Sequence, residues 1–579
     1  MTPIVPSPAA PDDGPPHQPA TGDRRGARSA SKGAVPPVLI AGAGPVGLCA
    51  ALTLARFGVP SLVLEAEAER DDDYFRRAGS KAICFQRDVL DAFDRVGAAA
   101  PLLDEGVTWT TARTYYRHHE VRTVTFPAMS GEVHLPPWIN ISQARVEQEL
   151  LRRADAEPLI DIRYRHRVTG VRQDADGVTA TADTPSGPFT ARGSHLIGAD
   201  GPHSTVRHLL GVGFPGESFA DRFLICDIRA DLPFPNERRF FFDPEWNPGR
   251  QVLVHQCPDS TWRIDWQVPD SYDIEDERAS GALDTRIRKI VGDQPYEIVW
   301  SSVYRFHERC AESFREGRVF LAGDAAHLYA PFGARGLNSG VHDAENLGWK
   351  LAYARTAAPE AAETLLRSYH AERWAAAQEN LRVTGDTMRF LVPHGEADTR
   401  RRRETLERAV TDRAARARID SGKLAEPFWY PASPLTTPPA IEEPIPTEAG
   451  QPRPPVPGVI CPDGPARVPG RTAVTRLRRL LGPGFTLITA RADRARALAD
   501  AAAELPVEVT AHALEDIDID GALAASLRCT AGTVHVVRPD AHLCAVLDTD
   551  ASDHAEAADG VLAAVRRACG EESPALIQP

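Results

Sequence analysis

Residues 38–47 read Val-Leu-Ile-Ala-Gly-Ala-Gly-Pro-Val-Gly and run directly into a segment rich in Ala and Leu. The apolar start predicts a buried parallel strand, and Gly42, Gly44 and Gly47 complete a G-x-G-x-x-G turn ahead of a helix. The first glycine permits the tight turn, the second lets the backbone approach a pyrophosphate, and the third lets the helix pack on the strand. The N–H groups and positive dipole of the helix N-terminus then face the phosphates. The pattern predicts a dinucleotide site.

An acidic residue at the next predicted strand end strengthens this prediction. The apolar run 61–64 ends at Glu65, 18 residues after Gly47. At this spacing an acidic side chain accepts hydrogen bonds from the ribose hydroxyls of an adenine dinucleotide. A glycine-rich turn without a ligand is the alternative, and it leaves the acid unexplained.

A second predicted strand also ends in an acid. Residues 195–207 read His-Leu-Ile-Gly-Ala-Asp-Gly-Pro-His-Ser-Thr-Val-Arg and place Asp200 at the strand's carboxyl end. Open α/β sheets bind ligands at this edge. Alternatively, Asp200 caps the helix that follows.

A third motif follows the same plan. Residues 317–327 read Gly-Arg-Val-Phe-Leu-Ala-Gly-Asp-Ala-Ala-His, and a glycine-rich turn then leads into a helix predicted over 341–354. Asp324 is suited to accept a hydrogen bond from a ribityl hydroxyl. The N–H groups of Leu337 and Asn338 are suited to face a ring carbonyl at the helix N-terminus.

Composition narrows the class of protein. The chain has 579 residues, too many for one core, and predicts about two to four domains. Its net charge of −14 argues against nucleic acid or an anionic membrane as the main partner. The nine cysteines show no C-x-x-C or Cys/His ligand spacing, so we expect no metal site, no disulfide framework and a cytoplasmic location. Residues 35–55 are uncharged and long enough to span a bilayer, but prolines and glycines interrupt them, so we expect no membrane contact.

The chain divides by composition into four parts. Residues 1–34 are rich in Pro, Gly, Ser and Ala and predict a disordered N-terminal extension. Within 35–425, the aromatic and β-branched runs of 105–140 and 215–312 are typical of an antiparallel sheet with one covered face. Residues 340–425 are predicted to be helical. Recurring prolines mark 426–457 as a linker, and 458–579 alternates short strands and helices.

Together the three motifs make the chain similar to the single-component FAD-dependent aromatic hydroxylases, the p-hydroxybenzoate and phenol hydroxylase superfamily. The resemblance covers about residues 36–400, and the part from Asp221 through the helix after Gly340 is most similar to the 3-(3-hydroxyphenyl)propionate hydroxylase-like branch. It implies an α/β fold, with a Rossmann-type FAD-binding domain and an inserted antiparallel substrate sheet in 35–425. Residues 458–579 resemble the thioredoxin-like C-terminal domain of phenol hydroxylase-type members, here without C-x-x-C, which implies a stabilising role or a homodimer.

The resemblance also assigns cofactor-binding residues. They are Gly42, Gly44, Gly47, Glu65, Lys81, Gln143, Asp200, Asp324, Pro331, Gly336, Leu337 and Asn338. Lys81 stands where the family usually has an Arg; it keeps the charge but not the bidentate fork. Arg335 stands where the family often has a Lys or Gln, and it is expected to help bind the charge of the reduced flavin. His327 belongs to the third motif, and structural packing explains it as well as any chemical role.

The implied chemistry uses NAD(P)H and O₂ as co-substrates. NAD(P)H reduces FAD, reduced FAD forms a C4a-hydroperoxide with O₂, and a phenolic ring activated as phenolate takes up the distal oxygen. The catalytic acid or base stays unassigned. His255, Asp265, Tyr115 and Tyr116 lie in strands expected to line the pocket, but an ordinary sheet position explains each of them too.

The main hypothesis is therefore a monooxygenase that hydroxylates a small aromatic or polycyclic phenol. One alternative keeps the fold but changes the reaction to Baeyer–Villiger oxidation or epoxidation of a polycyclic natural product. A second is a flavin-binding protein that no longer turns over, which the three intact motifs disfavour.

Overall fold

The structure is a computed structural model that describes residues 36–126, 134–393, 395–439, 443, 453–471 and 473–571. From Pro37 onward the described residues belong to one unit. The predicted N-terminal extension, 1–34, lies outside the described residues, as does most of the predicted linker after residue 439.

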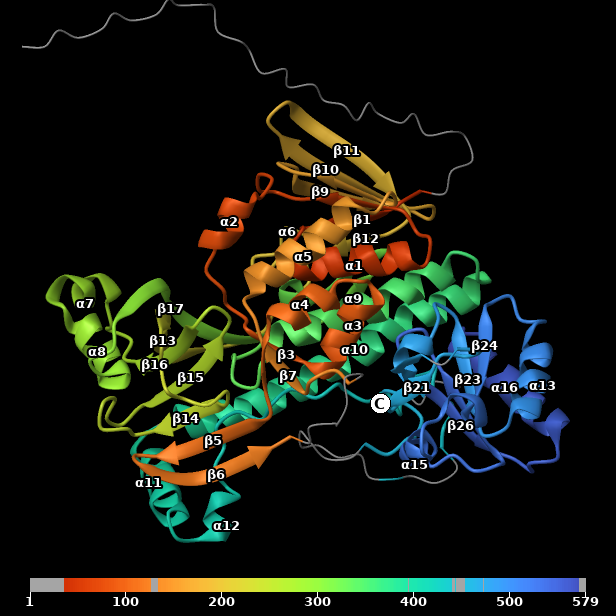
Figure 1. The fold of residues 1–579 in the computed structure, drawn as a ribbon. Coiled ribbons are helices and arrows are strands. Elements are labelled where there is room, and N and C mark those ends of the chain that lie inside the picture. The colour runs from red at the N-terminus through yellow and green to blue at the C-terminus, as the bar shows by residue number, and fades with distance from the viewer. Residues whose placement is uncertain are drawn as a thin grey trace, which may run out of the picture. The chain divides into compact units, whose positions relative to one another are not determined.

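A six-stranded sheet carries the first glycine motif at the end of a central strand, β1, which Figure 1 shows beside β12. Its order is β18-β19-β12-β1-β2-β8, and every pair is parallel except the edge pair of β18 and β19. The strands are β1 (Val38–Ala41), β2 (Ser61–Leu64), β8 (Ile160–Arg163), β12 (Leu196–Gly198), β18 (Arg315–Glu316) and β19 (Val319–Leu321). All residues of β1, β12 and β19 are buried, as expected for parallel strands covered on both faces. The predicted α/β core is confirmed.

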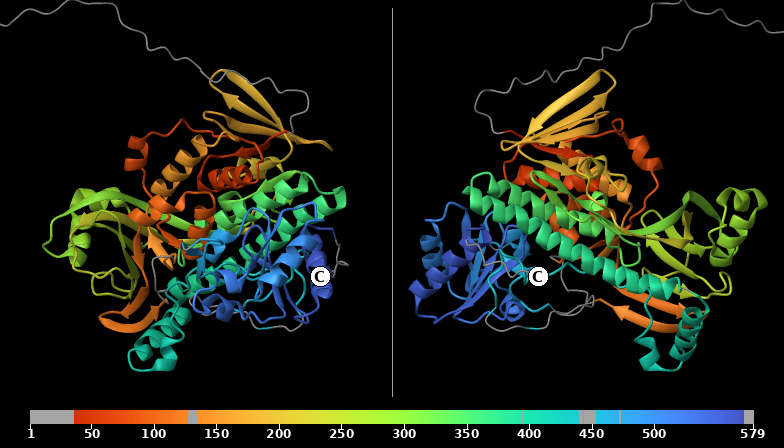
Figure 2. Two further views of the ribbon diagram at one scale, coloured as in Figure 1. Left: turned by 45° about the vertical axis from the view of Figure 1, so that its right-hand side comes forward. Right: turned by 180° about the vertical axis from the view of Figure 1, so that it is seen from behind.

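Two helices join the glycine motifs to this sheet. Helix α1 (Pro45–Arg56) packs against α9 (Gly336–Ala354), and α5 (Gln143–Asp155) packs on α1. The structure begins α9 at Gly336, five residues before the predicted start, so Leu337 and Asn338 lie in its first turn. Helix α10 (Pro359–Leu391) packs on α9, and Figure 2 shows it from behind as one long helix that leads to α11 (Gly395–Ala409).

The remaining elements of this half of the chain are short. The helices are α2 (Asp72–Arg77), α3 (Arg87–Arg95), α4 (Ala99–Glu105), α6 (Thr205–Leu209), α7 (Ile274–Ser280), α8 (Ala282–Val291) and α12 (Arg413–Arg416), with a 3₁₀ turn η1 (Gly323–Ala325). One three-stranded sheet joins β9 (Arg167–Gln173), β10 (Val178–Thr184) and β11 (Gly187–Gly193), and another joins β3 (Cys84–Gln86), β7 (Trp138–Asn140) and β4 (Val107–Trp109). Within the described ranges, no helix has the length and apolar character that crossing a membrane requires.

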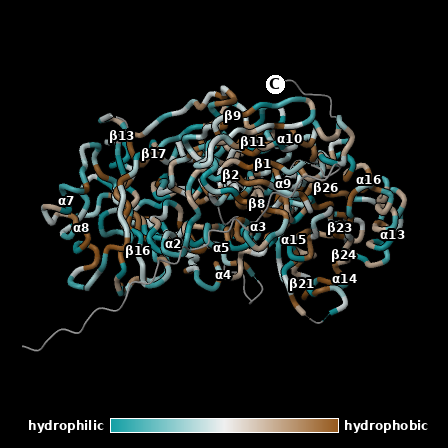
Figure 3. The backbone as a smooth tube through the Cα atoms, turned by 90° about the horizontal axis from the view of Figure 1, so that it is seen from above, coloured by the Kyte–Doolittle hydropathy of each residue, from teal (hydrophilic) through white to brown (hydrophobic). Residues whose placement is uncertain are grey.

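The second large sheet has eight strands, in the order β20-β17-β13-β16-β15-β14-β5-β6. They are β5 (Thr111–Tyr116), β6 (His119–Thr125), β13 (Gly216–Ala230), β14 (Arg238–Phe242), β15 (Gln251–Cys257), β16 (Thr261–Val268), β17 (Tyr296–Cys310) and β20 (His327–Leu328). Hydrophobic and hydrophilic stretches alternate along the chain around β13 and β16 in Figure 3. The sheet was expected to be antiparallel; instead β14 pairs with β5 in parallel, since these strands come from distant segments and no hairpin sets their direction. Of the predicted 105–140 region, β4 and β7 belong to the small sheet, and 127–133 lies outside the described residues.

The C-terminal residues build a separate four-stranded sheet with its own apolar core. Its order is β24-β23-β25-β26; β23 and β24 are parallel and the other pairs antiparallel. The elements are β21 (Pro465–Arg467), β22 (Val474–Arg476), η2 (Leu477–Leu480), β23 (Phe485–Thr489), α13 (Ala492–Ala502), β24 (Val509–Ala513), α14 (Leu514–Ile517), α15 (Ala522–Leu527), β25 (Thr533–Val537), β26 (Leu543–Asp548) and α16 (His554–Ala568).

The first part of the predicted linker packs against the helices. Residues 426–439 contain no helix or strand, yet Tyr430, Ser433 and Leu435 are buried. Ser433 Oγ donates to Glu372 Oε1 at 2.5 Å, and Tyr430 Oη accepts from Arg373 Nη1 at 2.8 Å. Side-chain burial therefore fixes this stretch even though its sequence lacks a periodic apolar pattern.

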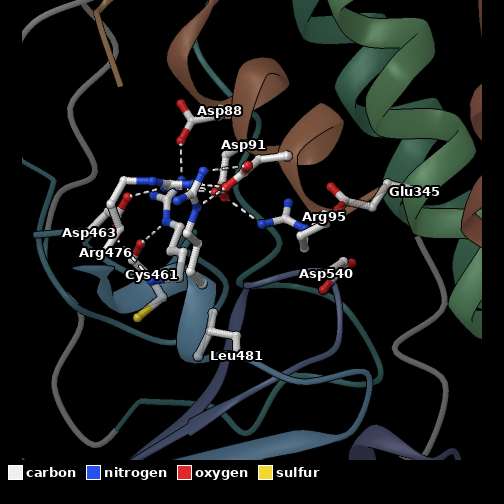
Figure 4. Close-up of polar contacts among 12 residues, drawn as sticks. Asp88, Asp91, Arg95, Glu345, Cys461, Asp463, Arg476, Leu481 and Asp540 are labelled. Carbon is white, nitrogen blue, oxygen red and sulfur yellow. Dashed lines mark hydrogen bonds and ion pairs between the residues drawn. The ribbon is translucent and has the colours of Figure 1, made fainter. Parts of the chain in front are cut away.

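A buried ionic cluster joins α3 to the residues around η2 (Figure 4). Asp88 pairs with Arg478 at 2.7 Å and with Arg453 at 2.9 Å, and Asp91 pairs with Arg476 at 2.9 Å. Charges removed from water require such partners, because an unpaired buried charge costs several kcal/mol. The cluster ties the C-terminal sheet region to the dinucleotide-binding region.

Candidate cofactor and substrate site

The glycine loops and the eight-stranded sheet border one cavity of about 520 Å³. Eight of the twelve predicted cofactor-binding residues line it. These eight are Gly44, Lys81, Gln143, Asp324, Pro331, Gly336, Leu337 and Asn338. Gly42, Gly47, Glu65 and Asp200 lie beside the cavity lining instead of in it.

The three glycines of the first motif differ in what surrounds them. A Cβ on Gly42, whose φ is +101°, would lie 2.5 Å from the Ala199 carbonyl oxygen, and one on Gly47 would lie 2.0 Å from the Gly42 carbonyl oxygen. A Cβ on Gly44 would meet nothing within 4 Å. Gly42 and Gly47 therefore allow close backbone packing, whereas Gly44 leaves the loop open toward the cavity.

Glu65 holds the glycine loop from the end of β2. Its Oε2 accepts the N–H of Ala43 at 2.6 Å, and its Oε1 accepts the N–H of Glu67 at 2.8 Å. Each carboxylate oxygen keeps a second lone pair, so these bonds leave acceptor capacity for a ribose hydroxyl.

The Asp200 side chain contacts the start of the helix that follows it, which the sequence allowed as the alternative to a ligand contact. Its Oδ1 accepts from Ser204 Oγ at 2.5 Å and its Oδ2 accepts the N–H of Val206 at 3.0 Å, so the carboxylate holds the first turn of α6 together with the N-cap residue Ser204. The neighbouring Gly201 and Pro202 line the cavity. A contact of the Asp200 side chain with the cofactor stays a prediction.

Asp324 presents a free carboxylate to the cavity. It lies in η1 directly after β19, and it has no hydrogen-bond or ion-pair partner among the described residues. The carboxylate is exposed to the cavity, and the enclosing protein raises its pKa by limiting its hydration, while the charges of His327 and Lys81 act to lower it. A carboxylate in this setting is suited to accept a hydroxyl hydrogen.

The start of α9 presents backbone donors to the same cavity. Gly336, Leu337 and Asn338 line it, and the first N–H groups of a helix have no acceptor within the helix. The Asn338 side chain points to other loops: it accepts the N–H of Gln86 at 3.1 Å and donates to the Cys84 carbonyl at 2.9 Å. This side chain fixes the turn and leaves the backbone N–H groups to the cavity.

His327 and Arg335 are held by protein contacts. His327 stacks on Tyr329 with 4.7 Å between ring centroids, and its Nε2 lies 2.6 Å from Asp343 Oδ2. Arg335 lines the cavity while it donates to Asn380 Oδ1 at 2.5 Å and to the Lys423 carbonyl at 3.1 Å.

These features fit a flavin dinucleotide. Gly44 leaves room for a pyrophosphate, Asp324 offers an unpartnered acceptor to a sugar-alcohol chain, and the α9 N-terminus offers donors to a ring carbonyl.

The eight-stranded sheet forms the other side of the cavity. His255 and Asp265 line it, as anticipated, but Tyr115 and Tyr116 do not. Tyr115 stacks on Phe241 with 4.9 Å between ring centroids, and Tyr116 is buried in the apolar cluster behind the cavity wall without reaching the lining. The apolar lining from the sheet is Phe223, Ile225, Leu253 and Phe306, and Phe332 and Leu424 add to it from loops.

Two cavity arginines were missed in the sequence. Arg238 on β14 and Arg263 on β16 both line the cavity. Strand alternation already places Arg238 on the same face of its strand as Phe240, and Arg263 on the same face as Asp265. Which face meets the cavity is set by the sheet register, which the sequence does not reveal.

Comparison with known proteins agrees with this geometry. The family model described as FAD binding domain matches residues 36–384. A 3-(3-hydroxy-phenyl)propionate/3-hydroxycinnamic acid hydroxylase of Mycolicibacterium smegmatis is 31% identical over 365 residues, which span 63% of this chain and 62% of that protein. This chain therefore matches less than two thirds of the length of that relative.

Two further likenesses extend the comparison. A 12-dehydrotetracycline 5-monooxygenase/anhydrotetracycline 6-monooxygenase of Streptomyces rimosus is 34% identical over 364 residues, covering 60% of this chain and 68% of that protein. The crystal structure of the flavin-dependent monooxygenase PieE in complex with FAD and substrate has a TM-score of 0.77 at 24% identity and covers 93% of this chain and 100% of its own. At that identity the likeness shows the fold alone.

Proposed function

We propose that this chain is a monooxygenase that uses NAD(P)H and O₂ to hydroxylate a phenolic aromatic ring. The chain belongs to the FAD binding domain family. The observation that carries the proposal is one cavity with two kinds of wall. One wall offers the glycine loops and Asp324; the other is an apolar and aromatic sheet face with a few buried polar groups. A cofactor and an aromatic ring can therefore meet in a space from which most water is excluded.

The cofactor would be held by the predicted set of residues. Gly42, Gly44 and Gly47 shape the pyrophosphate loop, and Glu65 holds that loop. The other proposed contacts are Lys81, Gln143, Asp200, Asp324, Pro331, Gly336, Leu337 and Asn338. When bound, FAD accepts a hydride from NAD(P)H and activates O₂, and the protein supplies orientation and a dry site.

The substrate class follows from the cavity and the relatives together. Phe223, Phe306 and Phe332 offer flat apolar surface to a ring, which suits a small or a polycyclic aromatic compound. The names of the two relatives above refer to a hydroxyphenylpropionate and to tetracyclines. A phenolic substrate of either size agrees with these observations.

We also propose that residues 458–579 form a thioredoxin-like domain after a linker at 426–457, and that 35–425 form the FAD-binding and substrate region. The strand order β24-β23-β25-β26 supports this assignment. The parallel pair of β23 and β24 is connected through helix α13, and the other pairs are antiparallel. The domain has no C-x-x-C, and no disulfide joins cysteines within the described residues, so a stabilising role is proposed in place of redox chemistry.

The test is NAD(P)H oxidation by the purified flavoprotein, with and without a panel of phenols that includes 3-(3-hydroxyphenyl)propionate, while hydrogen peroxide is followed in parallel. A hydroxylase oxidises NAD(P)H faster with one phenol, keeps peroxide low and yields a product heavier by one oxygen. If every phenol gives peroxide or no response, the proposal fails for phenols. A ring-expanded or epoxidised product would point to the alternative reactions.

A further inference from the structure

The apolar sheet wall contains one polar corner, made by side chains from three neighbouring strands. Arg238 lies on β14, His255 on β15 and Asp265 on β16, and all three line the cavity. The strand registers pair Leu253 with Asp265 and with Phe240, so these residues and their neighbours two positions away project from one face. The corner is therefore a product of the sheet register.

Arg238 is a buried cation that pairs with no carboxylate in the described part of the chain. Its side chain is only 3% exposed, its Nη2 donates to the Ser421 carbonyl at 2.5 Å, and it has no ion pair among the described residues. Arg263 on β16 differs, since it pairs with Asp227 at 2.7 Å and donates to the Ser80 carbonyl at 2.6 Å. Buried charges are normally paired. The missing partner of Arg238 is thus expected to come from the ligand in the cavity.

Asp265 is the group in this corner that can exchange a proton near neutral pH. Its Oδ1 is buried without a hydrogen-bond partner, and burial raises its pKa to about 7. Arg263 and Arg238 act to lower that pKa, and Asp227 acts to raise it.

The imidazole of His255 and the thiol of Cys84, which lies next to it on β3, are each fixed in one state at neutral pH. Burial, with Arg238 and Arg263, holds the pKa of His255 well below its ordinary value, so the imidazole stays neutral and is a weak base. Burial also raises the pKa of Cys84, whose Sγ lies 4.0 Å from His255 Nδ1, to about 12, so the thiol stays protonated.

We propose that Arg238, His255 and Asp265 form a subsite for the ionisable hydroxyl of a phenol or enol, in which Asp265 accepts the hydroxyl proton and Arg238 holds the oxygen anion. This inference rests on the proposed function and deepens it. The substrate O–H bond breaks and an O–H bond forms on the Asp265 carboxylate, while the electron pair stays on the substrate oxygen. The guanidinium of Arg238 then pairs with that charge, and neutral His255 lies on the intervening strand.

The experiment is a pH titration of 4-nitrophenol bound to the FAD-loaded protein, because its phenolate absorbs visible light and its neutral form does not. In the wild type, we expect the bound phenol to ionise at lower pH than the free phenol. Arg238→Met should weaken phenolate binding by about 10- to 100-fold, the usual worth of a hydrogen bond to a charged group. Asp265→Asn should remove the pH limb near 7 from the rate of NAD(P)H oxidation, and Arg238→Lys should restore part of the affinity.

Three controls make the result specific. Arg239→Met removes the adjacent arginine, which pairs with Glu237 at 2.9 Å and is absent from the cavity lining, and should leave 4-nitrophenol binding unchanged. 4-Nitroanisole has no ionisable hydroxyl, so Arg238→Met should not weaken its binding. Flavin content and the far-UV circular dichroism spectrum report whether each variant is folded.

Several outcomes would overturn the subsite. They are no binding of 4-nitrophenol by the wild type, equal phenolate affinity in Arg238→Met, or an effect of Arg238→Met on 4-nitrobenzoate alone, which would indicate a carboxylate subsite. A failure of the subsite can be distinguished from a failure of the proposed function. If phenolate binding depends on Arg238 but no phenol is hydroxylated, the subsite holds and the reaction is another; if hydroxylation occurs without that dependence, only the subsite is wrong.

Discussion

Arg373 on α10 and Asp343 on α9 form a buried ion pair directly behind the loop that carries Asp324. Arg373 Nε donates to Asp343 Oδ1 at 2.6 Å. The other carboxylate oxygen accepts the N–H of Gly323 at 3.0 Å and lies 2.6 Å from His327 Nε2. One carboxylate thus connects two helices to the backbone of the third motif, next to the proposed ribityl contact.

Replacing Asp343 with Asn should destabilise the protein by about 3–5 kcal/mol, because it leaves the buried Arg373 without its anion. Denaturant unfolding of the flavin-free protein measures this loss. The control is Asp386→Asn, since Asp386 forms only exposed pairs on α10, including one with Arg382 at 3.1 Å, and should cost less than about 1 kcal/mol. Equal stabilities of the two variants would contradict the role assigned to Asp343.

Replacing Asp324 with Ala should release FAD from an otherwise folded protein. The carboxylate has no partner in the described residues, so its loss breaks no internal contact. The measurement is the flavin-to-protein ratio after gel filtration, together with the far-UV circular dichroism spectrum. Asp161→Ala, at a half-buried position on β8, is the control and should retain flavin. Full retention of flavin by Asp324→Ala would refute the assignment.

Arg478→Met should unfold at markedly lower denaturant concentration than the wild type. This guanidinium is 4% exposed and pairs with Asp88 at 2.7 Å, so its removal leaves a buried carboxylate with one partner fewer and should cost about 3 kcal/mol. The neighbouring Arg479 is 52% exposed and pairs with Asp94 at 2.7 Å. Arg479→Met is thus a matched control with an expected loss below about 1 kcal/mol. A reversed order would show that the buried cluster contributes little.

The free energy of unfolding should fall at acid pH because the Asp91 carboxylate becomes protonated. Burial acts to raise the pKa of Asp91, but Arg95, Arg478 and Arg476 together lower it to about 2. A carboxylate whose folded pKa lies below its unfolded value of about 3.9 stabilises the fold above that value and loses its contribution as the pH falls toward 2.

The size of this contribution is about 2–3 kcal/mol. Urea midpoints measured from pH 6 down to the acid limit of folding test it. Asp91→Asn should flatten the acid dependence, whereas Asp161→Asn on the half-buried edge strand β8 should not. An unchanged slope in Asp91→Asn would exclude Asp91 as the source.

Local sequence determined the α/β core and most of the cofactor wall. Gly42, Gly44 and Gly47 recur at the spacing of a strand–turn–helix unit, and the structure shows close backbone packing at Gly42 and Gly47 and open space at Gly44. Asp324 follows a buried strand by three residues and does face the cavity. These features depend on contacts within a few residues, so the order of residues reveals them.

Tertiary structure alone decided which acids and cations meet. Asp88 and Arg478 are 390 residues apart, and nothing near either predicts their pairing. Arg238 and Asp265 share the cavity because strand register puts them on the same face. Strand alternation limits each side chain to one of two faces, but the choice between them depends on pairing with distant strands. Buried ion pairs such as that of Asp88 and Arg478 depend in the same way on packing between distant segments.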